Sequence, residues 1–240
     1  IFIGRFLGVD AISAFGLVSP LNFLILMIPS VFGVGLQTVY GMTVGKGDLK
    51  RANNYFSITV TVLAVLTVAL IAAIFAFLEP IAAVLGATGD AARLNPMVCT
   101  YVAGLLPGLL FNFMNTLISS MLFLKGNRSR AVLGAATISV VDVIGDALNV
   151  FVFSGGLMGM ALATSASWVV GFFVMGSYFV GKRSDVHLSL RGLNLRDISE
   201  VLRYGSTKLF EHTSLLLRSL IINRLVVAFG TPVDLAVCAI

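Results

Sequence analysis

The sequence predicts an all-α protein built as a polytopic bundle of transmembrane helices. Of its 240 residues, 58% are hydrophobic and only 11% are charged, less than half the charged fraction of an ordinary soluble domain. The charges are also unevenly spread, leaving several long stretches without any. The 24 glycines suit helices that pack closely in lipid, where small residues let backbones approach each other. This composition excludes a soluble enzyme.

Six segments are long enough to cross a bilayer, which takes about 20 apolar residues. In chain order we expect helices near 14–44, 52–78, 94–124, 128–153, 157–181 and 207–229. The fourth and sixth carry internal charges, and the other four lie in charge-free stretches. Residues 1–5 resemble the tail of a helix whose body is missing, and residues 234–240 resemble the start of another. We therefore expect a chain cut at both ends.

The basic residues predict the orientation of these helices. Twelve of the 16 Lys and Arg fall in loops 45–51 and 125–130 and in segment 181–208, and the positive-inside rule makes all three segments cytoplasmic. We expect a multi-pass protein of the plasma membrane. Residues 193–203 have the amphipathic pattern of a helix that lies in the interface plane. We expect this helix to be a solvated linker with no partner.

Asp142 and Asp146 are the clearest functional signal, because they fall in the middle and outer half of the fourth helix. Four residues apart, they share one helix face. A carboxylate at the bilayer centre costs about 2.5 to 3.5 kcal/mol on insertion scales. This favours an ion or proton site over the alternative, a structural polar network.

Thr164 is the predicted partner of Asp146. With a tight turn at Gly155, Asp146 is nine residues before the turn and Thr164 nine residues after it. On antiparallel helices the two side chains would lie at the same depth, where a hydroxyl can reach a carboxylate. The alternative is a hydroxyl that serves helix packing.

Arg218 is expected near the middle of the sixth helix, at about the depth of Asp142. It would either line an aqueous cleft, facing anionic groups or Asp142, or form a structural ion pair in a second bundle. Polar residues at helical spacing give further candidates for lining a cleft, although such residues are more often helix contacts. These candidates are Asn149, Gln37, Asn112 and Asn115.

The sequence contains no pattern typical of an enzyme or a metal site. Cys99 and Cys238 lie far apart, without a second Cys or His at metal spacing. No nucleophile stands beside a base, and no glycine-rich loop could hold a phosphate. We therefore expect no enzyme, no metal and no cofactor beyond a coupling ion.

Several motifs together resemble the multidrug and toxic compound extrusion (MATE) family over essentially the whole chain. They include Gly45-Lys46-Gly47-Asp48, Asp142-Val143-Ile144-Gly145-Asp146 and Gly159-Met160-Ala161-Leu162-Ala163-Thr164, with further similar stretches at residues 1–8, 14–20 and 33–35. The resemblance implies twelve helices in two six-helix bundles. Residues 1–180 would be the first bundle with its first helix truncated, 181–206 the cytoplasmic linker, and 207–240 the start of the second bundle.

The resemblance also implies a function and a site. The family exports organic, often cationic, compounds in exchange for protons or sodium ions. Its site in one bundle combines an Asp on helix one, an Asn and an Asp on helix five, and a Thr on helix six. Asp146 and Thr164 match the helix-five Asp and the Thr, whereas Asp142 stands where the family has Asn. The helix-one Asp would precede Ile1.

Two alternatives to an antiporter remain at this point. A lipid-linked oligosaccharide flippase of the same superfamily usually carries several basic residues in its cleft, whereas this chain offers mainly acids plus Arg218. A membrane scaffold without transport activity would bear the cost of two midplane carboxylates without need. We expect a small amphipathic substrate, a monomer in the bilayer, and no nucleic-acid partner.

Overall fold

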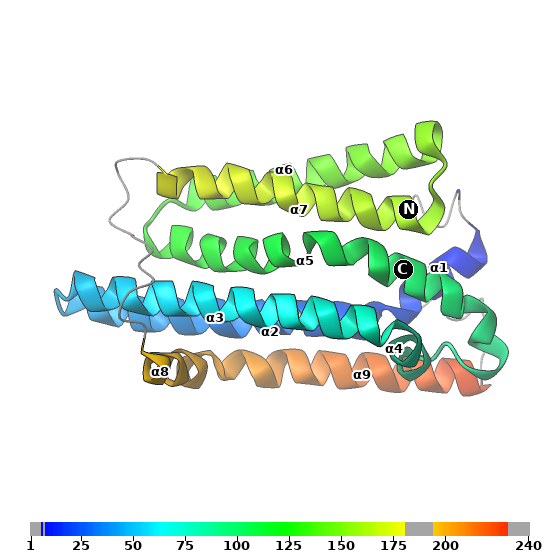
Figure 1. The fold of residues 1–240 in the computed structure, drawn as a ribbon, viewed down its shortest axis with the longest axis horizontal. Helices are drawn as coiled ribbons and strands as arrows, with labels where there is room; N and C mark the ends of the chain where they lie inside the picture. The colour runs from blue at the N-terminus through cyan, green and yellow to red at the C-terminus, as the bar shows by residue number, and fades with distance from the viewer. Residues whose placement is uncertain (1–5, 7, 181–193, 230–240) are drawn as a thin grey trace.

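The computed structural model describes residues 6, 8–180 and 194–229, and all regular elements of this part are helical (Figure 1). The prediction of an all-α helical bundle is confirmed. The elements are α1 (Val9–Leu17), α2 (Ser19–Gly45), α3 (Leu49–Ala76), α4 (Leu78–Leu85), η2 (Gly89–Leu94), α5 (Asn95–Leu124), α6 (Arg128–Leu148), η3 (Asn149–Phe153), α7 (Gly156–Val180), α8 (Leu195–Gly205) and α9 (Thr207–Phe229).

The long helices lie side by side, and their connections alternate between two ends of the bundle (Figure 1). One end holds the α2–α3 loop, the α5–α6 loop and α8. The other end holds α1, α4, η2 and the α6–α7 turn. The described parts of the three segments predicted to be cytoplasmic therefore lie at the same end. Residues 181–193 of the linker, residues 1–5 and residues 230–240 lie outside the described part.

In the described part of the chain, five helices are long and apolar enough to cross a membrane: Val9–Gly45, which joins α1 and α2, and Leu49–Ala76, Ala91–Leu124, Arg128–Phe153 and Gly156–Phe179. Five of the six predicted spans are thus found. The sixth, α9, has the expected bounds, but its charged residues make it less apolar. The helix α9 packs along α2.

Two local features were not predicted. The expected helix 14–44 is divided at Val18, and Pro20 follows in the first turn of α2, where its missing N–H leaves no helical hydrogen bond unmade. The outer connection between residues 78 and 94, expected to be a loop, contains α4 and η2. Gly86 ends α4 with a φ of 118°, a left-handed conformation that glycine adopts without strain.

The core is centred on α5, which packs against α2 and α3 on one side and α7 on the other. Leu109, Phe113 and Leu117 of α5 are fully buried. Toward α7 the contact is made by small residues. A Cβ on Gly108 would lie 2.5 Å from the Cα of Ser165, so the two helices touch through their backbones. The hydroxyl of Ser165 donates to the carbonyl of Gly104 at 2.7 Å.

The linker helix α8 packs against α2 of the same chain, which corrects our expectation of a solvated linker with no partner. A Cβ on Gly35 of α2 would lie 2.0 Å from the carbonyl oxygen of Val201, and a Cβ on Gly205 would lie 2.0 Å from that of Val31. The two helices thus touch through a reciprocal pair of glycines. The side chain of Val201 is completely buried in this contact.

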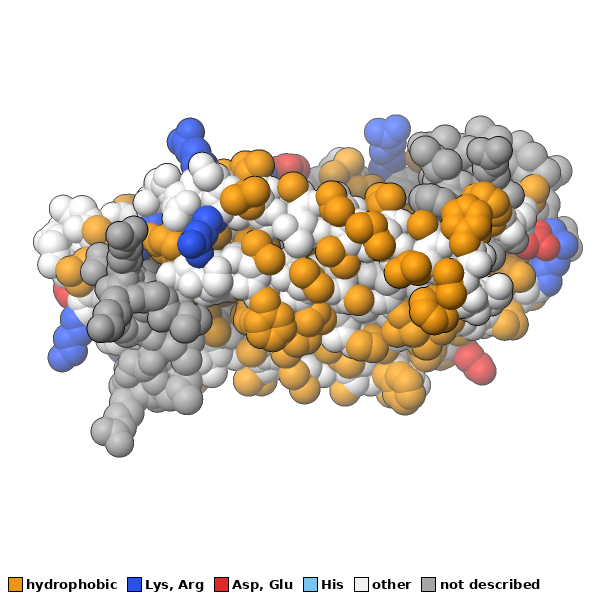
Figure 2. Space-filling model, turned by 90° about the horizontal axis from the view of Figure 1, so that it is seen from above, with side chains coloured by type: hydrophobic (Ala, Val, Ile, Leu, Met, Phe, Trp, Pro, Cys, Tyr) orange, Lys and Arg blue, Asp and Glu red, His pale blue; other side chains and the backbone are white. Residues whose placement is uncertain are grey.

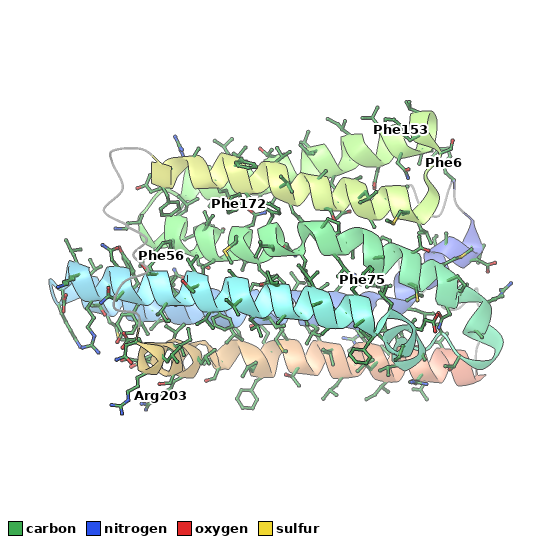
Figure 3. The ribbon with its side chains drawn as sticks, viewed as in Figure 1. Phe6, Phe56, Phe75, Phe153, Phe172 and Arg203 are labelled. Carbon is green, nitrogen blue, oxygen red and sulfur yellow. The ribbon has the colours of Figure 1, made fainter. Side chains whose placement is uncertain are left out.

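A polar contact joins α8 to α3 as well. The hydroxyl of Tyr55 donates to Glu200 and accepts from Arg51 at 3.0 Å. Figure 1 shows α8 nearly end-on, which means that its axis is at a large angle to those of the long helices. Figure 3 shows Arg203 of α8 pointing away from the bundle. The orientation agrees with a helix lying in the interface plane, docked on α2 and α3.

Candidate functional site

The α6–α7 hairpin carries Asp142, Asp146 and Thr164, and three close contacts define its register. A Cβ on Gly134 would lie 2.1 Å from Met175, one on Gly171 would lie 2.3 Å from Ile138, and one on Gly145 would lie 2.8 Å from the Cβ of Ala163. Because these contacts extend along both helices, α6 and α7 are antiparallel and closely packed throughout. The hairpin therefore holds its polar residues at defined depths.

Asn149 stabilises the turn of this hairpin. Its Nδ2 donates to the carbonyl of Gly156 at 2.9 Å, and its Oδ1 accepts from the N–H of Gly155 at 3.0 Å. The side chain is 4% exposed. The sequence places Asn149 among the candidates for lining a cleft. The structure corrects this, because both ends of its amide are used by the turn.

Asp142 and Asp146 lie on one face of α6 with half-buried side chains. The Oδ1 atom of each is buried and has no hydrogen-bond partner among the described residues. A buried carboxylate oxygen without a partner costs free energy, so the pair would gain from a proton or a bound cation. Within the described ranges, no group of three or more His, Cys, Asp or Glu could hold a metal ion.

Thr164 comes close to the expected depth. Gly145 packs on Ala163, and because the helices are antiparallel, Asp146 and Thr164 lie one residue to either side of this contact, about 3 Å apart in depth. The predicted hydrogen bond between Thr164 and Asp146 is not found in the described part of the chain. The carbonyl of Thr164 accepts from the hydroxyl of Ser167 at 2.7 Å. The side chain of Thr164 is half-buried, and its hydroxyl is not held by another residue there.

Phe6, which precedes α1, packs against the same hairpin. Figure 3 shows Phe6 near Phe153, in η3 at the outer end of the α6–α7 hairpin. The ring of Phe6 meets that of Phe151 edge-on, with centroids 5.4 Å apart. Phe6 therefore packs against η3, the element that directly follows the helix with the two acids.

The other polar candidates are not gathered around the acids. Asn115 is 4% exposed and lies between α5 and α7, where its Nδ2 donates to the carbonyl of Trp168 at 2.8 Å. This is a helix contact, the more frequent role of such residues. Gln37 and Asn112 are half-buried, on α2 and α5.

Arg218 lies far from Asp142. It is exposed and lines a cavity of about 230 Å³ between α1, α2 and α9, whereas α6 lies at the opposite edge of the bundle (Figure 1). In the described residues it forms no ion pair, so the predicted alternative of a contact with Asp142 is not found. The other residues that line this cavity are Gly16, Ser19, Phe23, Leu215, Ser219, Ile222 and Asn223.

Sequence reasoning missed the contacts at the outer end of α9. The buried Nδ2 of Asn223 donates to the carbonyls of Leu17 at 3.2 Å and Leu85 at 3.4 Å. Arg224 donates to Ala83 at 3.2 Å and to the next carbonyl of α4 at 3.0 Å, where a cation also suits the helix C-terminus. The contacts with the carbonyls of α4 could not be foreseen, because α4 itself was not predicted.

The MATE-like motifs and this helical arrangement agree with a direct comparison of sequences. A family model named MatE matches residues 1–151. The chain belongs to the MATE family. The curated relatives it matches include the multidrug export protein MepA of Staphylococcus aureus. The chain is 26% identical over 215 residues to MepA of strain MSSA476, an alignment that covers 85% of this chain and 45% of MepA. It is 28% identical over 217 residues to MepA of strain MRSA252.

Solved structures of MATE transporters share the fold. An inward-facing multidrug resistance MATE transporter matches with a TM-score of 0.89 and 22% identity, over 97% of this chain and 53% of that one. An outward-facing one matches with a TM-score of 0.81 and 22% identity, over 90% and 48%. The predicted MATE-like fold is thereby confirmed. The chain spans about half the length of the relatives it matches.

Proposed function

We propose that the complete protein is a secondary antiporter of the plasma membrane that exports organic, often cationic, compounds in exchange for protons or sodium ions. Family membership supports a transporter, and the relative MepA is a multidrug export protein. The observation that carries the antiport proposal is the pair Asp142 and Asp146, whose buried Oδ1 atoms have no partner in the described residues. A scaffold would have no use for such a pair.

The two acids suit an exchange of ions because of their spacing. One turn apart on α6, their Cβ atoms are separated by about 5 to 6 Å, and two negative charges at this separation repel each other strongly at low dielectric. A proton or a sodium ion relieves this repulsion. Coupling to a second ligand requires that the pair bind its ion with different affinity in the two states of the transport cycle, and we assign this difference to the repulsion between the two acids.

The roles proposed for the two acids differ. Asp142 stands where the family has an amide, so in this proposal it holds a proton at rest and forms hydrogen bonds as Asn would. Asp146, nearer in depth to Thr164, exchanges its proton or cation during the cycle. The hydroxyl of Thr164, which has no partner among the described residues, supplies an oxygen for the bound ion.

The test uses the full-length protein in liposomes, with a fluorescent organic cation as substrate and an imposed proton or sodium gradient. We expect efflux that depends on one of the two gradients and is lost in Asp146→Asn. The matched control is Asp48→Asn, which removes an acid from a cytoplasmic loop. Asp48 caps α3 by accepting from the N–H of Arg51 at 2.9 Å, and Asn also caps helices well. Gradient-driven efflux that survives Asp146→Asn would contradict the proposal.

A further inference from the structure

A groove on the outside of the α6–α7 hairpin is not used by the proposed transport mechanism. It has a volume of about 560 Å³ and is lined by Arg130 and Leu133 of α6 and by Val170, Phe173, Val174 and Ser177 of α7. Two of its apolar side chains are strongly exposed, 60% for Leu133 and 64% for Phe173. Exposed apolar residues on a membrane-length helix contact lipid unless a protein covers them.

The groove faces away from the acids. Leu133 precedes Asp142 by nine residues, and Phe173 follows Thr164 by nine. At about 100° per residue, nine residues turn a helix by two and a half turns, so Leu133 and Phe173 lie on the sides of their helices opposite Asp142 and Thr164. The groove is thus on the outer side of both helices.

This face is also distant from α9, which the family resemblance assigns to the second bundle. Figure 1 shows the α6–α7 hairpin and α9 at opposite edges of the bundle. Figure 2, seen from the hairpin side, shows hydrophobic side chains over the middle of the face and Lys and Arg mainly toward its ends. This arrangement of charge suits a surface that lies in the bilayer.

The groove has a polar end and an apolar end. Arg130 lies at the cytoplasmic end, where its Nη1 donates to the hydroxyl of Ser177 at 3.0 Å. Its guanidinium is 5.8 Å from the ring centroid of Tyr178. Both partners are neutral, so they orient the cation without cancelling its charge, and no ion pair involves Arg130 in the described residues. From Ser177 to Val170 the groove then runs about 10 Å toward the membrane centre.

We propose that this groove binds an anionic phospholipid of the cytoplasmic leaflet. The phosphate lies against Arg130, whose planar fork of donors matches phosphate oxygens, and one acyl chain lies along Leu133 and Phe173. The polar end is at the level of the headgroups and the apolar end is deeper, which is the order of groups in a lipid. Basic pockets between helices on the cytoplasmic side bind anionic headgroups in this way.

The test measures which lipids stay bound to the full-length protein. The protein would be reconstituted in vesicles that contain equal amounts of phosphatidylglycerol and phosphatidylcholine. The vesicles would be dissolved in mild detergent, and the lipids that co-purify with the protein would be counted by mass spectrometry. We expect phosphatidylglycerol to be enriched, and Arg130→Gln to lower its enrichment about fivefold, the factor expected for one basic contact at the membrane surface. Arg128→Gln is the matched control, because it removes the same charge from the same turn but does not line the groove.

Two further measurements complete the test. Phe173→Asn, which makes the apolar part of the groove polar, should lower the retention of phosphatidylglycerol while Arg130 is intact. Excess glycerol phosphate should not displace the lipid, because it lacks the acyl chain. If Arg130→Gln does not fold, Arg130→Lys takes its place and should lose part of the enrichment. Equal losses in the Arg130 and Arg128 variants, or no enrichment in the unaltered protein, would overturn the proposal.

Discussion

Gly145 of α6 lies directly against Ala163 of α7, so closely that a Cβ on Gly145 would be 2.8 Å from the Cβ of Ala163. This contact occurs between the two residues that precede Asp146 and Thr164 in their helices. The closest approach of α6 and α7 in this region is therefore beside the proposed ion site. A change in the ionisation of Asp146 therefore takes place next to a tightly packed contact between α6 and α7.

The first prediction concerns this crossing. Gly145→Ala should destabilise the protein relative to Gly176→Ala, which is on the same hairpin and has no atom within 4 Å of the added Cβ. Both changes gain the same helix propensity, about 1 kcal/mol, so their difference reports the crowded contact, which we expect to cost about 1 to 3 kcal/mol. Thermal unfolding in detergent measures it. Equal stability of the two variants would show that the helices separate easily at Gly145.

The second prediction separates the two acids. Asp142→Asn in the full-length protein should keep appreciable efflux, with a shifted dependence on pH or sodium, because Asn can form the hydrogen bonds of a protonated acid. Asp146→Asn should abolish coupled efflux and leave membrane insertion intact. Ion-driven efflux is compared at matched expression. Equal loss in both variants would mean that the pair acts as one unit.

The third prediction concerns the docking of α8. A Cβ on Gly35 would lie 2.0 Å from the carbonyl oxygen of Val201, so Gly35→Ala should push α8 away from α2. Amide hydrogen exchange of residues 195–205 should then become faster. Gly45→Ala serves as the control, since nothing on another element lies within 4 Å of its added Cβ. Unchanged exchange in Gly35→Ala would show that other contacts hold α8 in place.

The fourth prediction concerns the orientation in the membrane. Single cysteines at the exposed residues Lys50 and Ser129 should be shielded from impermeant thiol reagents in intact cells, because loops rich in Lys and Arg stay in the cytoplasm. Cysteines at the exposed residues Ala92 and Ser154 should react. The background carries no other cysteine in this chain, with Cys99 and Cys238 replaced by alanine. Reaction at both Ser129 and Ser154 would be incompatible with α6 crossing the membrane.

The sequence by itself determined which segments form the long helices and at which end each connection lies. The fourth predicted helix, 128–153, corresponds to α6 and η3, and the fifth, 157–181, to α7. Both follow from the length of apolar stretches and the position of charges, which are properties of neighbouring residues. The similar depth of Asp146 and Thr164 also followed, because a tight turn makes the register of a hairpin a matter of counting.

Tertiary structure decided which residues meet across the bundle and which side chain holds the α6–α7 turn. The contact of Gly35 with Val201, the distance between Arg218 and Asp142, and the capture of Asn149 by its own turn were not predicted. Each depends on how helices rotate about their axes and cross, or on backbone groups freed at a turn. The apolar content of a segment does not reveal how its helix is rotated about its axis. A glycine that lets two backbones touch does not reveal which residue of another helix it will contact.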